Sequence, residues 1–336
     1  MGKVVCFGEV LLRLSAPGKE MLMQSPNLAA HVGGAETNVA VGLAKLGGSA
    51  AIVSVLPNNP LGHACAGEVR RHGVDTSPIQ YRDGRMGLYF LTHGAGHRPA
   101  EVLYDRAGSA FATASPDSID WETILAGAEW LHVSGITPAV SAEGAEAALR
   151  AVKAAKSAGV KVSYDCNFRA RLWGARTSQA PALLSELCTY ATLIFGDDRD
   201  IAFMLNFKAG ADAAERRKLA AQKAFETFSS LQWIAHTERT HLTVDVQQLA
   251  GTLHDRKTSY TTKPYPLHGI VDRIGGGDAF AAGILHGLVN GWSAQRTVEF
   301  GTAAGVLKHS IPGDFNLVTL SDVELLLSEV QTDVRR

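Results

Sequence analysis

The chain has 336 residues, of which 46% are hydrophobic, and its formal net charge is -1 at neutral pH. This length and composition predict a sizeable buried core, while the lack of a basic excess argues against a nucleic-acid-binding protein. The four cysteines are scattered without metal-ligand spacing and no apolar stretch suits a signal peptide or a membrane span, so we expect a cytoplasmic protein with no membrane partner.

Short apolar segments alternate with helical patterns along most of the chain. In chain order we predict strand 4–7, helix 36–46, strand 51–55, helix 62–72, strand 130–133, helix 142–157, strands 161–164 and 193–195, helix 213–228, strand 233–235, and helices 278–290, 293–309 and 321–330. Such alternation is typical of a mostly parallel sheet covered by helices on both faces. The sequence therefore predicts a three-layer α/β/α fold.

Two segments depart from the alternation. Residues 85–110 have the pattern of a β-hairpin without an intervening helix, and residues 10–32 hold a second irregular β-like piece. Because no repeat or low-complexity linker separates them from the rest, we predict one domain over residues 1–336 with a small β-sheet lid inserted at about 10–32 and 85–110. An edge strand of this lid would be exposed in a monomer, so we expect a homodimer formed through the lids.

Three consecutive glycines, Gly275, Gly276 and Gly277, precede Asp278 at the start of a predicted helix. Free backbone amides and the positive end of the helix dipole together form a natural phosphate site. A carboxylate would repel a phosphate, so Asp278 is better placed to accept a proton from a hydroxyl that attacks a phosphoryl group. The alternative, taken on this motif alone, is an ordinary glycine turn with Asp278 as the helix N-cap.

A second glycine pair, Gly33-Gly34, opens the helix at 36–46. Glycine has no side chain, so a ligand can approach the backbone closely there. The alternative is a tight turn that only serves packing of the helix.

A polar cluster at 165–169 follows strand 161–164, and ligands of open α/β sheets bind beyond such strand ends. Arg169 in this cluster suits a carboxylate or phosphate. A weak surface ion pair of Asp165 with Arg169 or Arg171 is the alternative.

Two further groups of polar residues are candidates for ligand or metal binding. Strand alternation places Tyr104 and Arg106 on one face of the hairpin with Tyr89 nearby, which suits an anionic small molecule, although ordinary exposed hairpin residues would look the same. Asp197 and Asp200 follow strand 193–195 and could hold Mg²⁺. An acidic helix N-terminus explains these two aspartates equally well.

Taken together, segments 33–38 and 275–278 resemble the paired signatures of the ribokinase-like (PfkB) carbohydrate kinases, and the resemblance covers residues 3–330. Segments 104–110, 165–169 and 311–316 are similar to those of family members that act on 2-keto-3-deoxygluconate. The resemblance implies a ribokinase-like fold and phosphorylation of this sugar acid by ATP and Mg²⁺ to 2-keto-3-deoxy-6-phosphogluconate. A monovalent cation (K⁺) near Asp272 and Ile274 is common in the family.

The resemblance also implies a role for each matching residue. Asp278 would be the base, and the amides of Gly275, Gly276 and Gly277 would form the anion hole. The residues that would hold the substrate are Gly33, Gly34, Asn38, Tyr89, Tyr104, Arg106, Arg169 and Asp314. Those that would contact ATP are Asn167, Arg169, Asp197, Thr237, Arg239, Gly275 and Gly277. Asp197 and Asp200 would serve the metal, although the family usually has an Asn-x-x-Glu motif there.

The choice of substrate rests on two arginines. Leaving Arg106 and Arg169 unpaired in a closed site would be costly, which favours a sugar acid over a neutral sugar. A kinase for fructose, ribose or 2-keto-3-deoxygalactonate remains an alternative, as does a non-catalytic sugar sensor on the same fold. Asp278 argues against the sensor, because binding alone needs no base; we expect it to be a weak base at the positive end of a helix.

Overall fold

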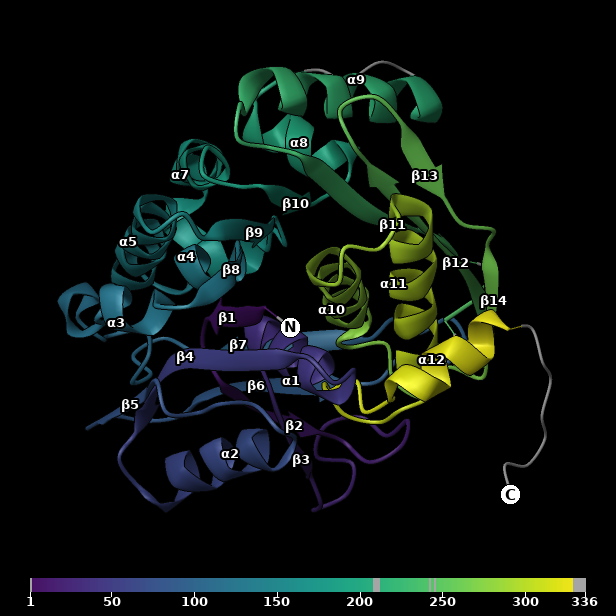
Figure 1. The fold of residues 1–336 in the computed structure, drawn as a ribbon. Helices are drawn as coiled ribbons and strands as arrows, with labels where there is room; N and C mark the ends of the chain where they lie inside the picture. Colours follow the sequence, from purple (N-terminus) through teal and green to yellow (C-terminus); the bar gives the residue numbers. More distant parts are fainter. Residues whose placement is uncertain (1, 208–211, 242, 245, 329–336) are drawn as a thin grey trace.

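The computed structural model describes residues 2–207, 212–241, 243–244 and 246–328. Within these ranges the strands form one large sheet and one small sheet, and helices cover both faces of the large sheet (Figure 1). The predicted α/β architecture, with a mostly parallel central sheet and a separate small sheet, is confirmed.

The large sheet has the strand order β13-β12-β11-β10-β9-β8-β1-β4-β5, with β14 paired to β12. Its strands are β1 (Lys3–Phe7), β4 (Ser49–Pro57), β5 (Ile79–Arg82), β8 (Ala128–Ser134), β9 (Lys161–Asp165), β10 (Leu193–Phe195), β11 (Trp233–His241), β12 (Val246–His254), β13 (Ser259–Thr261) and β14 (Tyr265–His268). Neighbours from β5 to β11 pair in parallel, whereas β12 is antiparallel to β11, β13 and β14. The antiparallel end was not predicted.

Strand β1 shows why these segments are apolar throughout. Val5 and Phe7 pack into the core on one face of the sheet, and Val4 and Cys6 pack into the core on the other. A strand buried on both faces needs an apolar side chain at every position. Free thiols also fit such positions, and all four cysteines are buried and unpaired.

Helices form a layer on each side of this sheet (Figure 1). On the Val5 and Phe7 side lie α3 (Trp121–Leu125), α4 (Ile136–Val140), α5 (Ala142–Ser157), α6 (Ala170–Trp173), α7 (Ala180–Cys188), α8 (Asp198–Met204) and α9 (Ala213–Thr227). On the other side lie α1 (Ala35–Lys45), α2 (Pro60–Arg71), α10 (Gly276–Val289), α11 (Ala294–Lys308) and α12 (Leu320–Leu327). No helix in the described ranges is long and apolar enough to cross a membrane.

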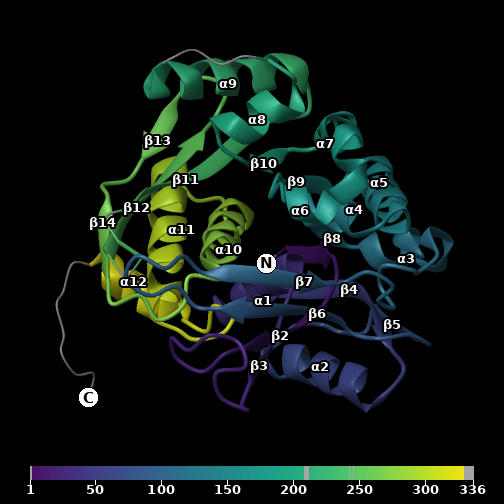
Figure 2. The same ribbon diagram turned by 180° about the vertical axis from the view of Figure 1, so that it is seen from behind.

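The small sheet is formed by β3 (Ala29–Gly33), β2 (Leu11–Ser15), β6 (Gly87–Thr92) and β7 (Glu101–Asp105), in that order. The predicted hairpin is the antiparallel pair β6 and β7, and the irregular piece at 10–32 contains the antiparallel pair β2 and β3. Strands β2 and β6 join the two pairs in parallel. Both views place this sheet near α1 and α2, at the opposite end of the molecule from α9 (Figure 2).

Candidate active site

The glycine turn before α10 is built to leave backbone amides open. Gly275 is the N-cap of the helix and has a left-handed backbone (φ 80°), and a Cβ at this position would overlap the carbonyl oxygen of Asp314. No described side chain caps the helix, and a Cβ added to Gly277 would meet no described atom within 4 Å. The alternative of Asp278 as N-cap is therefore wrong. The free amides and the dipole at this end form an anion site.

Asp278 lies in the first turn of α10, half-buried at the wall of the cavity that contains the glycine turn. Its Oδ2 accepts a hydrogen bond from Asn38 Nδ2 at 2.7 Å, which fixes the carboxylate. Burial raises the pKa of Asp278 to about 6, outweighing the hydrogen bond from Asn38, which lowers it. We expected a weak base from the helix dipole; burial instead makes this carboxylate more basic than an ordinary aspartate.

The cavity has a volume of about 570 Å³ and runs from the small sheet to the carboxyl ends of β9 and β10 and the middle of β11. It brings together most of the residues that the sequence predicted for the site. Those that line it are Gly34, Asn38, Tyr89, Tyr104, Arg106, Asn167, Arg169, Asp197, Asp200, Thr237, Gly275, Gly276, Gly277, Asp278 and Asp314. Ligands of open α/β sheets bind at this edge, so the placement matches the expectation.

Two predicted residues do not line the cavity. A Cβ on Gly33 would overlap the carboxylate of Asp314, so this glycine serves to let that side chain approach. Arg239, expected to contact ATP, instead bonds Gln247 Oε1 at 2.6 Å and His309 Nε2 at 2.9 Å. Burial, with a smaller effect of the charge of Arg273, lowers the pKa of Arg239 to about 10.

Asp314, which lines the cavity, is held by two partners. Tyr89 donates its hydroxyl to Asp314 Oδ2, and the guanidinium of Arg13 lies 2.9 Å from Oδ1. Arg13 also pairs with Asp272 at 2.6 Å, and its side chain is only 1% exposed. Burial raises the pKa of Asp314 to about 6. Arg13 was not predicted from the sequence, where its one signal is a charged residue inside a mostly apolar strand.

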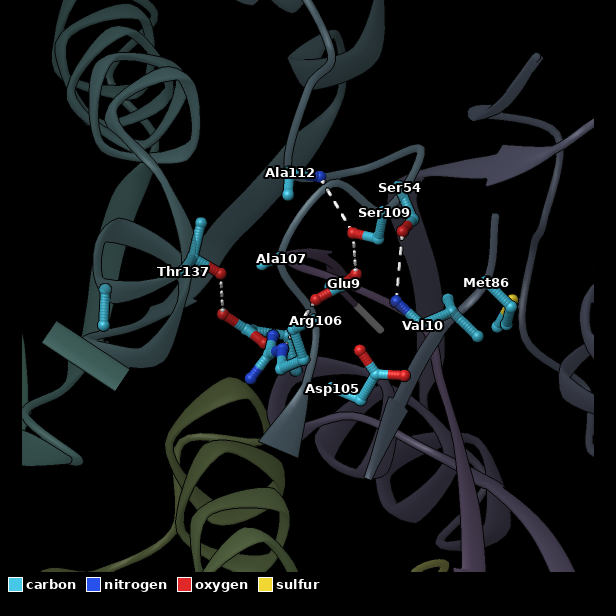
Figure 3. Close-up of polar contacts among 12 residues, drawn as sticks. Glu9, Val10, Ser54, Met86, Asp105, Arg106, Ala107, Ser109, Ala112 and Thr137 are labelled. Atoms are coloured by element: carbon cyan, nitrogen blue, oxygen red, sulfur yellow. Dashed lines mark hydrogen bonds and ion pairs between the residues drawn. The ribbon is translucent and has the colours of Figure 1, made fainter. Parts of the chain in front are cut away.

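Arg106 carries a neutralised charge at the cavity wall. It follows the end of β7, and its Nε donates to Oε2 of Glu9 at 2.7 Å, while Ser109 Oγ donates to Oε1 of the same carboxylate (Figure 3). Both side chains of this ion pair are at least 95% buried. The expectation that Arg106 has no partner in the protein is therefore wrong, but it lines the cavity and its two Nη groups bond no other described residue, so its contact with a substrate stays a prediction. Glu9, two residues after the end of β1, was missed as its partner.

Arg169, by contrast, is an uncommitted guanidinium. Its side chain is exposed and donates only to the carbonyl oxygen of Phe168, at 3.0 Å, among the described residues. The alternative of a surface ion pair with Asp165 is not formed within the described chain. Asn167 beside it has a left-handed backbone (φ 35°) and donates to Ser134 Oγ at 3.3 Å. Arg169 is thus free to bind an anion in the cavity.

Asp197 and Asp200 close a capping box at the start of α8. Asp197 Oδ1 accepts the amide of Asp200 at 3.1 Å, and Asp200 Oδ2 accepts the amide of Asp197 at 3.0 Å. Burial raises the pKa of Asp200 to about 6. The described residues contain no group of three or more histidine, cysteine or acidic side chains that could hold a metal ion. The helix-terminus alternative therefore accounts for this pair, and a direct metal cage is not present in the described chain.

The chain is similar in sequence and fold to known carbohydrate kinases. A family model described as pfkB family carbohydrate kinase matches residues 1–316. The crystal structure of a 2-dehydro-3-deoxygluconokinase from Thermotoga maritima is 38% identical, with a TM-score of 0.92 over 98% of this chain and 100% of the other. That of a putative 2-keto-3-deoxygluconate kinase from Enterococcus faecalis is 31% identical, with a TM-score of 0.93 over 100% and 99%.

Among curated relatives, a 2-dehydro-3-deoxygalactonokinase from Haloferax volcanii is 33% identical over 325 residues, which is 97% of this chain and 96% of that protein. The similarity extends along nearly the whole chain and includes both glycine turns and Asp278 within the matched range. The predicted ribokinase-like fold is thus confirmed, and the chain belongs to the pfkB family of carbohydrate kinases.

Proposed function

We propose that this carbohydrate kinase transfers the γ-phosphoryl group of ATP to the terminal hydroxyl of 2-keto-3-deoxygluconate in the cytoplasm. The observation that carries the proposal is the position of Asp278. Its carboxylate, with a pKa raised to about 6 by burial, lies directly beside the open amides of Gly275 to Gly277. A proton acceptor next to an anion hole is what in-line transfer to a hydroxyl requires. A mere sugar sensor would not need it.

Each residue at the turn has a distinct part in the proposed reaction. The amides of Gly275, Gly276 and Gly277 would bind the oxygens of the transferring group, where negative charge develops. Asp278, mostly ionised above about pH 6, would accept the proton of the attacking hydroxyl. Asn38 would keep that carboxylate aimed at the hydroxyl through its 2.7 Å hydrogen bond.

ATP would lie against Asn167, Asp197 and Thr237, which line the far end of the cavity. Mg²⁺, which neutralises phosphate charge, normally keeps several waters and binds through one or two carboxylates and the phosphates. Asp197 and Asp200 would hold it through water, because one oxygen of each already accepts a backbone amide at the start of α8 and Asp197 Oδ2 accepts from Arg199. Binding of Mg²⁺ through water therefore suits this pair of aspartates better than direct coordination does.

The carboxylate of the sugar acid is assigned to Arg169. Its guanidinium is uncommitted and lines the cavity, whereas that of Arg106 is neutralised by Glu9. A charge-assisted bond to Arg169 would discriminate against neutral sugars by about 1.5 to 3 kcal/mol. Tyr104 and Gly34 also line the cavity and would face the sugar chain. The curated relative from Haloferax volcanii makes the galactonate-derived epimer a second candidate substrate.

The experiment is ADP release from MgATP by the purified protein with four acceptors: 2-keto-3-deoxygluconate, 2-keto-3-deoxygalactonate, fructose and ribose. Turnover with the keto-deoxy acids and little with the neutral sugars is the expected result. Turnover with fructose or ribose alone would keep the kinase and reject the substrate. No turnover with any acceptor, with protein that is folded, would favour a different acceptor or the non-catalytic sensor.

We also propose a homodimer formed through the small sheet. Leu103 on β7 is 59% exposed, and Met21 and Met23 in the segment between β2 and β3 are 59% and 76% exposed. Exposed apolar side chains beside an edge strand are a liability that a partner would cover. Light scattering at micromolar concentration is expected to give twice the mass of one chain, and a monomer would contradict the proposal.

A further inference from the structure

Lys308, the last residue of α11, is completely buried. Its ammonium donates to the carbonyl oxygen of Ile311 at 2.9 Å. Its stem lies beside the phosphate turn, because an ideal Cβ on Gly275 would be 3.3 Å from Lys308 Cε. An ammonium is expensive to bury unless nearby charge compensates it. Its position against the anion hole therefore calls for an explanation beyond packing.

The surrounding charges explain why the ammonium is tolerated. Burial lowers the pKa of Lys308, whereas Asp272, Asp314 and Asp278 raise it and Arg13 lowers it. Three carboxylates thus face two cationic side chains in this cluster. Arg13 already pairs with Asp272 and Asp314. Without Lys308, the cluster would hold an excess of two negative charges next to the site where phosphate oxygens must bind, and low dielectric would strengthen the repulsion.

The same cluster bears on the monovalent cation expected near Asp272 and Ile274. The carboxylate of Asp272 accepts from Arg13 at 2.6 Å, from the amide of Ile274 at 3.0 Å and from the amide of Gly313 at 3.0 Å. Its oxygens are therefore occupied, and two cationic side chains stand beside it. The positive charges of Arg13 and Lys308 would repel a further cation at Asp272.

We propose that Lys308 is a positioning residue whose ammonium provides the fixed positive charge beneath the Gly275 to Gly277 turn, so that phosphoryl transfer needs no added monovalent cation. The inference rests on the proposed kinase function. A fixed charge of this kind acts on charge that develops in the transition state and requires no reorganisation during the reaction. Because Lys308 lies behind the backbone of the turn, it acts on the amides and their field and does not touch the substrate.

Two substitutions separate charge from shape. Lys308→Met keeps the length of the side chain and removes its charge, whereas Lys308→Ala also opens a space beside the Ile311 carbonyl. Lys263→Met, at an exposed lysine, is the matched control. Each protein is assayed with its best acceptor in buffers that contain K⁺, Na⁺ or only tetramethylammonium.

The wild type is expected to show the same kcat in all three buffers, within about twofold. Lys308→Met is expected to lose kcat by at least about tenfold, with little change in the KM for the sugar, as fits an interaction made in the transition state. K⁺ is expected to restore much of kcat in Lys308→Ala, where there is room for it, and none in Lys308→Met. A wild type that requires K⁺, or a Lys308→Met variant with normal kcat, would overturn the proposal.

Thermal denaturation gives a readout that does not depend on turnover. K⁺ is expected to raise the Tm of Lys308→Ala more than tetramethylammonium does, and to leave the Tm of the wild type unchanged. A K⁺-specific rise in the Tm of the wild type would show that a cation binds there despite Lys308. No K⁺-specific rise in the Tm of Lys308→Ala would show that K⁺ does not take the place of the lost ammonium, which would contradict the proposal. If the wild type phosphorylates none of the acceptors, the proposed function fails, and the Tm measurements still decide the role of Lys308.

Discussion

Replacing Asp278 with asparagine should remove activity and stabilise the protein at the same time. The amide oxygen of asparagine can still accept the hydrogen bond from Asn38, so Asp278→Asn removes the charge and keeps the shape. Loss of a positioned general base is expected to lower kcat by about a hundredfold to ten-thousandfold. The affinity for the sugar should change little.

The gain in stability follows from the pKa of Asp278. Burial raises it from 3.8 to about 6, and each pH unit corresponds to about 1.4 kcal/mol. Because the folded-state pKa is the higher one, ionisation destabilises the folded protein: the full cost is present above about pH 6 and disappears below about pH 4. Asp278→Asn should therefore raise the free energy of unfolding by up to about 3 kcal/mol at about pH 7.5, and by about half of that at about pH 5.

Urea denaturation of both proteins at the two pH values measures this difference, and ADP release measures kcat. In the wild type, kcat should fall as the pH drops through about 6, because the base becomes protonated. The reasoning is refuted if Asp278→Asn keeps a near-normal kcat. It is equally refuted if the two proteins are equally stable at about pH 7.5, because ionising Asp278 in the folded protein would then carry no desolvation cost.

Three further substitutions test the walls of the cavity. Arg169→Ala should raise the KM for 2-keto-3-deoxygluconate by about tenfold to a hundredfold and leave that for fructose unchanged in any residual turnover, and an equal effect on both would reject the carboxylate assignment. Arg106→Ala should destabilise the protein by about 3 to 5 kcal/mol in urea denaturation, because Glu9 would be left buried and unpaired, and a loss confined to activity would contradict this. Tyr89→Phe should cost about 1 to 2 kcal/mol in the same assay, since Asp314 loses one donor and keeps Arg13, and an unchanged stability would show that the hydroxyl bond contributes nothing.

The alternation of apolar runs and helical patterns was sufficient to predict the parallel part of the large sheet except for its edge strand β5, which was missed. Strands such as β1 are buried on both faces, so nearly every residue in them is apolar and the strand appears as a continuous apolar run. Strands β12, β13 and β14 were missed. In β12 buried and more exposed residues alternate, and its polar positions weaken the apolar pattern of a strand that lies at the antiparallel end of the sheet.

The glycine turn and Asp278 could be identified because consecutive residues determine the backbone geometry of such a short motif. The residues that pair with the charged side chains of the site could not be identified from the sequence. Arg13 and Asp272 are 259 positions apart in the chain and Glu9 and Arg106 are 97 apart, so only the fold brings each pair together. For the same reason the sequence suggested Arg106 as a free cation, and gave no signal that Lys308 lies beside Gly275.

The most direct test is the identity of the product. Wild-type protein, MgATP and 2-keto-3-deoxygluconate would be followed by ³¹P nuclear magnetic resonance until the ATP is consumed. The account predicts one new phosphomonoester, attached at the terminal carbon of the sugar acid and formed in equal amount with ADP. ADP with free phosphate and no phosphomonoester, or a phosphate on another hydroxyl, would contradict the placement of the acceptor between Asp278 and the glycine turn.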